Sequence, residues 1–288
     1  MQKPKNRSKR QTRTAPSSPE GSALDLRSIE TLVATFGDAQ QDDDAVDTAQ
    51  NIMYDAWEAS DRRRRIALAK KALKTSPLCA DAYVLLAQEA AQNPDEAIDL
   101  YRQGVEAGEK VLGKAAFRED VGQFWGLLET RPYMRARHGL ARALWDKSHR
   151  DEAVTHFQAM LDLNPNDNQG IRYVLIDRLL TLGRDHEAAE LIERYSEDGS
   201  AAWSWSRALL EFRRNGDAAK SRAALSQAMS DNEHVAPLLL GDRKMPRRLP
   251  AYISWGGKDE AVAYVHGAAA GWAAADGALA WLRAHKER

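Results

Sequence analysis

The stretch LNPNDNQGIRY, from Leu163 to Tyr173, gathers Pro, Gly, Asp and Asn residues that could bind a cation or a phosphate. A calcium loop starting at Asp162 needs Gly at its sixth position and Glu at its twelfth, where this sequence has Asp167 and Tyr173. A phosphate loop needs a strand before it and a Lys after its glycines, and the stretch has neither. We therefore expect a turn in which a polar side chain after Pro165 caps the following helix. The candidate caps are Asn166, Asp167 and Asn168.

Other residues with catalytic or metal-binding potential are isolated in the sequence. His186 and Glu190 share a helix face, but zinc needs three or four converging ligands and no second His completes the set. Cys79 has no basic neighbour in sequence, and no Gly-x-Ser-x-Gly nucleophile turn occurs. The sequence therefore predicts a protein that is not an enzyme and has no cofactor and no metal.

The composition is that of an ordinary soluble protein. The 288 residues contain 41 Lys and Arg against 42 Asp and Glu, so net charge does not indicate a partner. A single cysteine fits a reducing compartment, and no run of about 18 apolar residues occurs. The first 13 residues are rich in Lys and Arg, without the apolar segment of a secretory signal. We expect a cytoplasmic location and no membrane contact.

The pattern of apolar residues predicts an all-α chain. They recur at helical spacing, as in Leu68, Ala72 and Leu73, and short polar breaks such as NPDE and RNGD separate helix-length pieces. We expect a disordered basic tail at residues 1–23 and helical repeats at 24–230, with an inserted helical segment near 105–133. Residues 231–288 would form a Pro-punctuated linker and a C-terminal helical cap, with the Pro-rich part extended.

Two segments repeat each other. RARHGLARALWDKSHRDEAVTHFQAMLDLNP aligns with GIRYVLIDRLLTLGRDHEAAELIERY, at an offset of 34 residues in the first helix and 35 in the second. The period and the small residues resemble the tetratricopeptide repeat, a helix-turn-helix unit. Its characteristic positions are matched by Leu140, Ala141, Ala153, Phe157 and Pro165. The resemblance implies a right-handed superhelical solenoid of helix pairs that cover one another's apolar faces.

Four further segments narrow this resemblance. LETRPYMRARHGLA, LNPNDNQGIRY, DNEHVAPLLLG and GALAWL together resemble a soluble bacterial group of tetratricopeptide proteins, similar to the suppression-of-tumorigenicity family. That likeness implies no enzymatic activity and names no ligand.

In a tetratricopeptide array the first helix of each unit lines a concave groove, so residues on that face are the candidate peptide-binding positions. The copy beginning at Met134 and the next copy provide them: Arg135, His138, Arg142, Trp145, Gln169 and Arg172. Because arginine pairs with carboxylates, we expect a scaffold that binds a protein or peptide, of acidic character, in a partly basic groove. The alternative from another class is a nucleic-acid or ribosome-associated factor that acts through the basic tail.

Overall fold

The computed structural model describes residues 43–286, and the predicted tail at 1–23 lies outside the described residues. The chain divides into two units at Asp44, and the helices below lie in the second, Ala45–Arg288, apart from residues 43 and 44 of the first helix. A helix over residues 43–58 comes first. It is followed by α2 (Arg62–Thr75), α3 (Ala80–Glu89), α4 (Pro94–Glu119), α5 (Arg131–Asp146), α6 (Arg150–Leu163), α7 (Ile171–Leu182), α8 (Asp185–Arg194), α9 (Ala201–Asn215), α10 (Ala219–Asp231), α11 (Val235–Leu239), α12 (Lys258–Ala274) and α13 (Ala278–Lys286).

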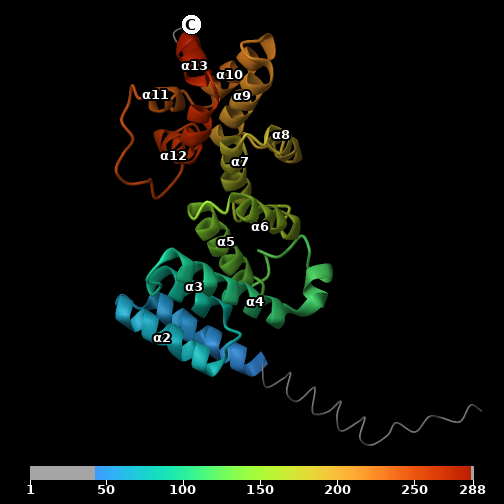
Figure 1. The fold of residues 1–288 in the computed structure, drawn as a ribbon, viewed down its shortest axis with the longest axis vertical. Coiled ribbons are helices and arrows are strands. Elements are labelled where there is room, and N and C mark those ends of the chain that lie inside the picture. The colour runs from blue at the N-terminus through green and yellow to red at the C-terminus, as the bar shows by residue number, and fades with distance from the viewer. Residues whose placement is uncertain (1–42, 287–288) are drawn as a thin grey trace, which may run out of the picture. The chain divides into compact units, whose positions relative to one another are not determined.

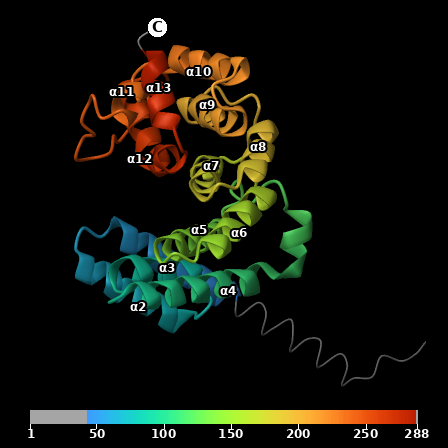
Figure 2. The same cartoon turned by 45° about the horizontal axis from the view of Figure 1, so that its top comes forward.

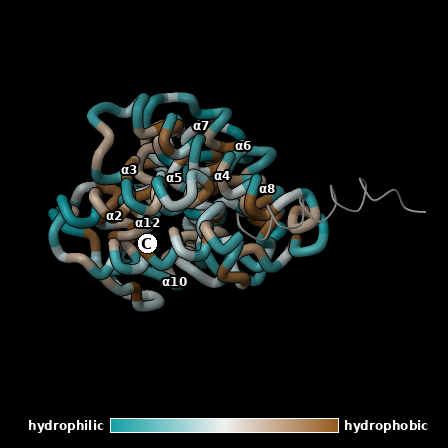
Figure 3. The backbone as a smooth tube through the Cα atoms, turned by 90° about the horizontal axis from the view of Figure 1, so that it is seen from below, coloured by the Kyte–Doolittle hydropathy of each residue, from teal (hydrophilic) through white to brown (hydrophobic). Residues whose placement is uncertain are grey.

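Consecutive helices pack as pairs (Figure 1). The pairs are α3–α4, α5–α6, α7–α8 and α9–α10, and successive pairs contact each other through α4–α5, α6–α7 and α8–α9. The hydrophobic residues of the helices meet in shared cores, while most connections are hydrophilic (Figure 3). All regular secondary structure within residues 43–286 is helical, so the predicted all-α fold of helix pairs is confirmed.

The turn after Pro165 forms as expected. Helix α6 ends at Leu163, and the carboxylate of Asp167 accepts hydrogen bonds from the backbone N–H groups of Ile171 (2.7 Å) and Arg172 (2.9 Å). The N-cap position itself is Gly170, and Asp167, three residues before it, satisfies two of the N–H groups that begin α7.

The burial pattern corrects the repeat register in the first helix. Leu140 and Leu144 of α5 are buried, and their buried counterparts in α7 are Leu175 and Leu179. The offset is therefore 35 residues, as it is in the second helix, where Ala153 of α6 matches Ala188 of α8. The expected offset of 34 had aligned Leu144 with Arg178, which is only half-buried.

The chain between Val105 and Tyr133 combines a long helix with a set of turns. Helix α4 continues to Glu119 but breaks at Gly113, where φ is 62°. Turns then lead to α5, and Thr130 just before it is buried. Gly108 of α4 lies so close to Tyr133 that an added Cβ would be 2.8 Å from the Cβ of Tyr133, so the two helices need glycine at this crossing.

The C-terminal part packs onto the preceding pairs. Pro237 lies within the short helix α11, so the Pro-rich segment is less extended than its three prolines predict. Helix α12 contacts α7, α9 and α11, and Figures 1 and 2 both show it beside α7. The buried rings of Trp272 in α12 and Trp205 in α9 lie 6.0 Å apart. Glu260 of α12 also accepts a hydrogen bond from the backbone N–H of Ala201, at the start of α9 (2.9 Å).

Candidate functional site

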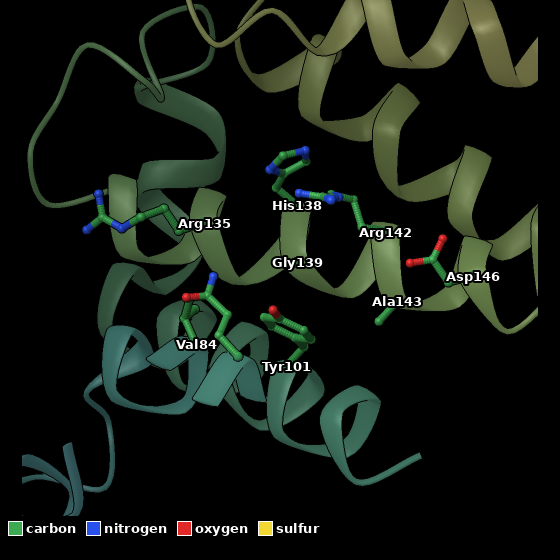
Figure 4. Close-up of a pocket in the computed structure, with 9 residues that line it drawn as sticks. Val84, Tyr101, Arg135, His138, Gly139, Arg142, Ala143 and Asp146 are labelled. Atoms are coloured by element: carbon green, nitrogen blue, oxygen red, sulfur yellow. The ribbon is translucent and has the colours of Figure 1, made fainter. Parts of the chain in front are cut away.

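A pocket of about 470 Å³ lies between α3, α4 and α5 (Figure 4). We call it the groove pocket, because α3 and α5 are the first helices of their pairs and contact each other directly. Its lining residues are Val84, Gln88, Tyr101, Arg135, His138, Gly139, Arg142, Ala143 and Asp146. The volume is within the usual range of ligand sites, and the lining mixes apolar surface with groups that can form hydrogen bonds.

The base of the groove pocket is set by the contact between Gly139 and Tyr101. A Cβ on Gly139 would lie 2.1 Å from Cε1 of Tyr101, so only glycine lets the ring cross α5 at this point. Tyr101 is buried, and burial raises the pKa of its hydroxyl. The result is a rigid, uncharged surface beneath the polar side chains.

Arg135 is engaged by the protein itself. Its Nε and Nη2 donate to Oδ1 (2.7 Å) and Oδ2 (2.5 Å) of Asp81, a fully buried carboxylate of α3. Gln50 donates to the same carboxylate (2.9 Å), and the guanidinium lies 5.1 Å from the centre of the Trp57 ring. This bidentate pair neutralises both charges and joins α3 to α5, so Arg135 is mainly a structural residue.

His138 and Arg142 have unused hydrogen-bonding capacity. Burial, together with the charge of Arg142, lowers the pKa of His138 to about 4, so its imidazole is neutral near pH 7. Its buried Nε2 has no hydrogen-bond partner among the described residues. Arg142 is exposed and, within residues 43–286, forms no ion pair. Figure 4 shows the two side chains next to each other, between Arg135 at one end of the row and Asp146 at the other.

Trp145 extends this surface from α5 towards α7. Two guanidinium groups lie near its ring, that of Arg150 at 5.4 Å and that of Arg178 at 4.5 Å from the ring centre. Arg178 forms no ion pair with any described residue, and burial lowers its pKa even though Asp177 and Asp146 favour the charged form. Trp145 therefore does not line the groove pocket, but it lies on a neighbouring cationic surface.

Gln169 and Arg172 lie elsewhere. Arg172 donates from Nε to Asp198 (2.7 Å) and from Nη1 to Asp167 (3.1 Å), and both carboxylates are buried. The corrected offset of 35 explains this placement, because Arg135 and His138 then match Gly170 and Tyr173 rather than Gln169 and Arg172. The residues of α7 that match Arg142 and Trp145 are Asp177 and Leu180. These two residues face α12, with Gly267 against Asp177 and Gly271 against Leu180.

The described residues contain no group of three or more His, Cys, Asp or Glu side chains that could hold a metal ion. His186 lies 3.5 Å from Glu190, but both side chains are exposed. Burial raises the pKa of the Cys79 thiol to about 11, so this cysteine is protonated and a poor nucleophile near pH 7.

Sequence reasoning missed Asp81, Arg178 and Asp177. The two aspartates interrupt the apolar segments ADAYVLL and VLIDRLL, and a lone acid on a buried helix face is the signal that could have identified them. Arg178 was hidden by the register error of one residue.

The curated proteins that this chain resembles carry closely related names. The chain is 28% identical over 284 residues to Protein ST7 homolog of Caenorhabditis elegans, covering 84% of this chain and 51% of that protein. It is 28% identical over 268 residues to Suppressor of tumorigenicity 7 protein-like of Gallus gallus, covering 83% and 47%. The Homo sapiens protein of the same name is 27% identical over 272 residues, with 84% and 46% covered. The chain thus spans about half the length of the curated relatives it matches.

Among solved structures, the chain is similar to YrrB, described as a TPR protein with an unusual peptide-binding site. The TM-score is 0.45 at 19% identity, and the match covers 65% of this chain and 84% of that one. None of the helices in the described part of the chain has the length and apolar character needed to cross a membrane. Residues 35–287 match the family described as ST7 protein, and this chain belongs to that family.

Proposed function

We propose that this protein is a non-catalytic scaffold that binds an acidic peptide or protein segment in the groove pocket. The observation that supports this most directly is Arg142, an exposed arginine that lines the pocket beside the neutral His138 and forms no ion pair with any described residue. A guanidinium is donor-only and planar, so an unpaired one in a concave pocket favours a ligand that supplies carboxylate acceptors. We further propose that this binding occurs in the cytoplasm.

The ligand has both acidic and apolar character in this proposal. Arg142 would bind a carboxylate of the ligand, because its planar guanidinium matches two carboxylate oxygens. The Tyr101 ring and Val84 would contact an apolar side chain beside that carboxylate. Arg178 and Trp145 offer a second cationic position for a longer ligand.

The predicted arginines have different roles, some structural and one in ligand binding. Arg135 and Arg172 hold buried carboxylates of their own chain, so they shape the protein rather than bind the ligand. Because α12 covers the matching face of α7, the open part of the groove lies along α3 and α5. A short extended segment fits this length better than a folded domain does.

Site-specific crosslinking tests the proposal. A photoreactive amino acid replaces Gln88, which lines the groove pocket, and in a second protein replaces Arg214, an exposed residue at the end of α9. Mass spectrometry then identifies the crosslinked segments. We expect the Gln88 position to capture segments rich in Asp and Glu, with capture reduced about tenfold by Arg142→Ala, as loss of one charge-assisted contact predicts.

Arg207→Ala is the matched control, since it removes an exposed arginine outside the groove pocket. Capture of the same segments at both crosslinking positions would refute binding in the pocket. Capture that is unchanged in a folded Arg142→Ala protein would refute the role of Arg142.

A further inference from the structure

The connection between α11 and α12 exposes large apolar side chains to solvent. We call residues 243–255 the 243–255 loop. Its exposed fractions reach 86% for Tyr252, 70% for Trp255 and 59% for Ile253, and Leu249 and Met245 are exposed as well. Figures 1 and 2 both show its backbone running out beside α11 and α12 before it returns to the start of α12. Exposed apolar patches of this kind mark contact surfaces for a protein or a membrane.

Both ends of the 243–255 loop are held by the folded protein. Just before the loop, the carboxylate of Asp242 accepts a hydrogen bond from Nζ of Lys286 (2.7 Å). Just after it, the backbone N–H of Gly256 donates to Oε2 of Glu260 (2.8 Å). Between them, residues 244–253 form no hydrogen bonds with any described residue. The loop is thus anchored at its base, and its apolar residues point away from any core.

The loop is also strongly basic. It contains four exposed cations, none of which forms an ion pair within the described residues: Arg243, Lys244, Arg247 and Arg248. The only acid between residues 241 and 257 is Asp242, and Arg283 and Lys286 of α13 already pair with it. Cations therefore dominate the 243–255 loop itself, although the whole chain is nearly neutral.

We propose that the 243–255 loop binds the surface of membranes that contain anionic lipids. Lys and Arg near such a surface are attracted by its negative potential, and Trp and Tyr favour the boundary between headgroups and acyl chains. Ile253 and Leu249 would enter the outer acyl region. The contact is peripheral and differs from a spanning helix. It departs from the absence of membrane contact expected from the sequence, because net charge and apolar run length do not detect a short surface loop.

The aliphatic residues favour lipid over nucleic acid. Single-stranded nucleic acid binds through cations and aromatic rings that stack on bases, which would use Tyr252 and Trp255 but not Met245, Leu249 or Ile253. A lipid surface uses all of them, and it accepts a projecting loop without needing a complementary cavity.

Vesicle binding of the full chain tests this proposal. Vesicles of phosphatidylcholine alone are compared with vesicles containing about one-third phosphatidylserine, an anionic lipid. We expect binding only to the anionic vesicles, weakening as salt screens the charges. Replacing Arg243, Lys244, Arg247 and Arg248 by Gln should lower the partition coefficient by on the order of several hundredfold, since each cation near an anionic surface contributes a factor of about five.

The matched control removes the same charge from another exposed region. Arg63, Arg64, Lys70 and Lys71 of α2 are exposed and form no ion pairs with described residues. Their replacement by Gln should change the partition coefficient by less than about threefold, because charges away from the contact are largely screened.

Brominated acyl chains distinguish loop insertion from binding through the basic N-terminal residues. Bromine should quench tryptophan fluorescence in the wild type, and Trp255→Tyr should remove this quenching while binding persists. Vesicle binding without quenching of Trp255 would overturn the proposal. Equal loss of binding in the loop and α2 variants would also overturn it, as would RNA binding that requires the loop in a protein that ignores vesicles.

Discussion

Replacing Asp177 by Asn should remove a pH-dependent loss of folding stability that arises where α7 contacts α12. The side chain is half-buried, and its buried Oδ1 has no hydrogen-bond partner in the described part of the chain. Gly267 of α12 lies so close that an added Cβ would be 2.0 Å from Oδ2. Burial raises the pKa of Asp177 from 3.8 to about 8, although the charge of Arg178 acts in the opposite direction.

The sign follows from proton linkage. Between about pH 4 and pH 8 the folded protein holds a proton on Asp177 that the unfolded chain has released, so the free energy of unfolding falls as pH rises through this window. A pKa difference of about 4 units corresponds to about 5 kcal/mol. Because solvent reaches part of the side chain, we expect about half of this value, or about 3 kcal/mol.

Urea denaturation followed by tryptophan fluorescence provides the measurement. Asp177→Asn should match the wild type near pH 4 and exceed its stability by about 3 kcal/mol at pH 8, a rise in Tm of about 6–12 °C. Asp95→Asn is the control, because that side chain is 72% exposed. A difference between wild type and Asp177→Asn that does not change with pH would show that Asp177 stays ionised and would refute the reasoning.

Three further predictions concern the groove pocket and the buried carboxylates that arginines hold. Gly139→Ala should destabilise the protein by about 3 kcal/mol in thermal unfolding, because the new Cβ meets the Tyr101 ring, whereas Gly199→Ala, with open space around it, should change stability little. Arg135→Ala should cost about 3–5 kcal/mol by leaving the Asp81 charge buried and unpaired, whereas Arg142→Ala should leave the urea midpoint nearly unchanged; equal effects would contradict the assigned roles. Burial alone raises the pKa of Asp198, but hydrogen bonds from Ser200, Arg172 and Tyr173 outweigh burial, so the pKa is lowered. Asp198→Asn should therefore destabilise the protein at pH 7, and this effect should disappear as pH falls below about 4. A destabilisation that grows in acid would contradict this.

The helices and turns could be predicted because local chemistry determines them. The apolar period of α5 and α6 requires a helix pair, and Pro165 followed by Asp167 ends one helix and caps the next within a few residues. The groove face of α5 was predicted from the tetratricopeptide resemblance together with helical spacing. Arg135, His138 and Arg142 line one pocket, and their binding of a peptide stays a prediction.

Such local patterns could not predict ion pairs between residues that lie far apart in the sequence. The partner of Arg135 is Asp81, 54 residues earlier, and the partner of Arg172 is Asp198, 26 residues later. Nothing in the local sequence distinguishes these arginines from the unpaired Arg142. The inserted residue that sets the 35-residue offset was equally hidden, since it moves Arg172 off the groove face while preserving the helical pattern.

The packing of α12 against α7 and α9 has a practical consequence for deletion mapping. Shortening the chain at Gly257 would remove the helix that holds Trp272 against Trp205 and Gly267 against Asp177. A fragment ending there would present a tryptophan and a half-buried acid where the full chain presents a closed surface. Non-specific binding through this newly exposed surface would be easily mistaken for a binding activity that the C-terminal helices normally inhibit. Point substitutions on α12, which keep the helix in place, separate true partners from that artefact.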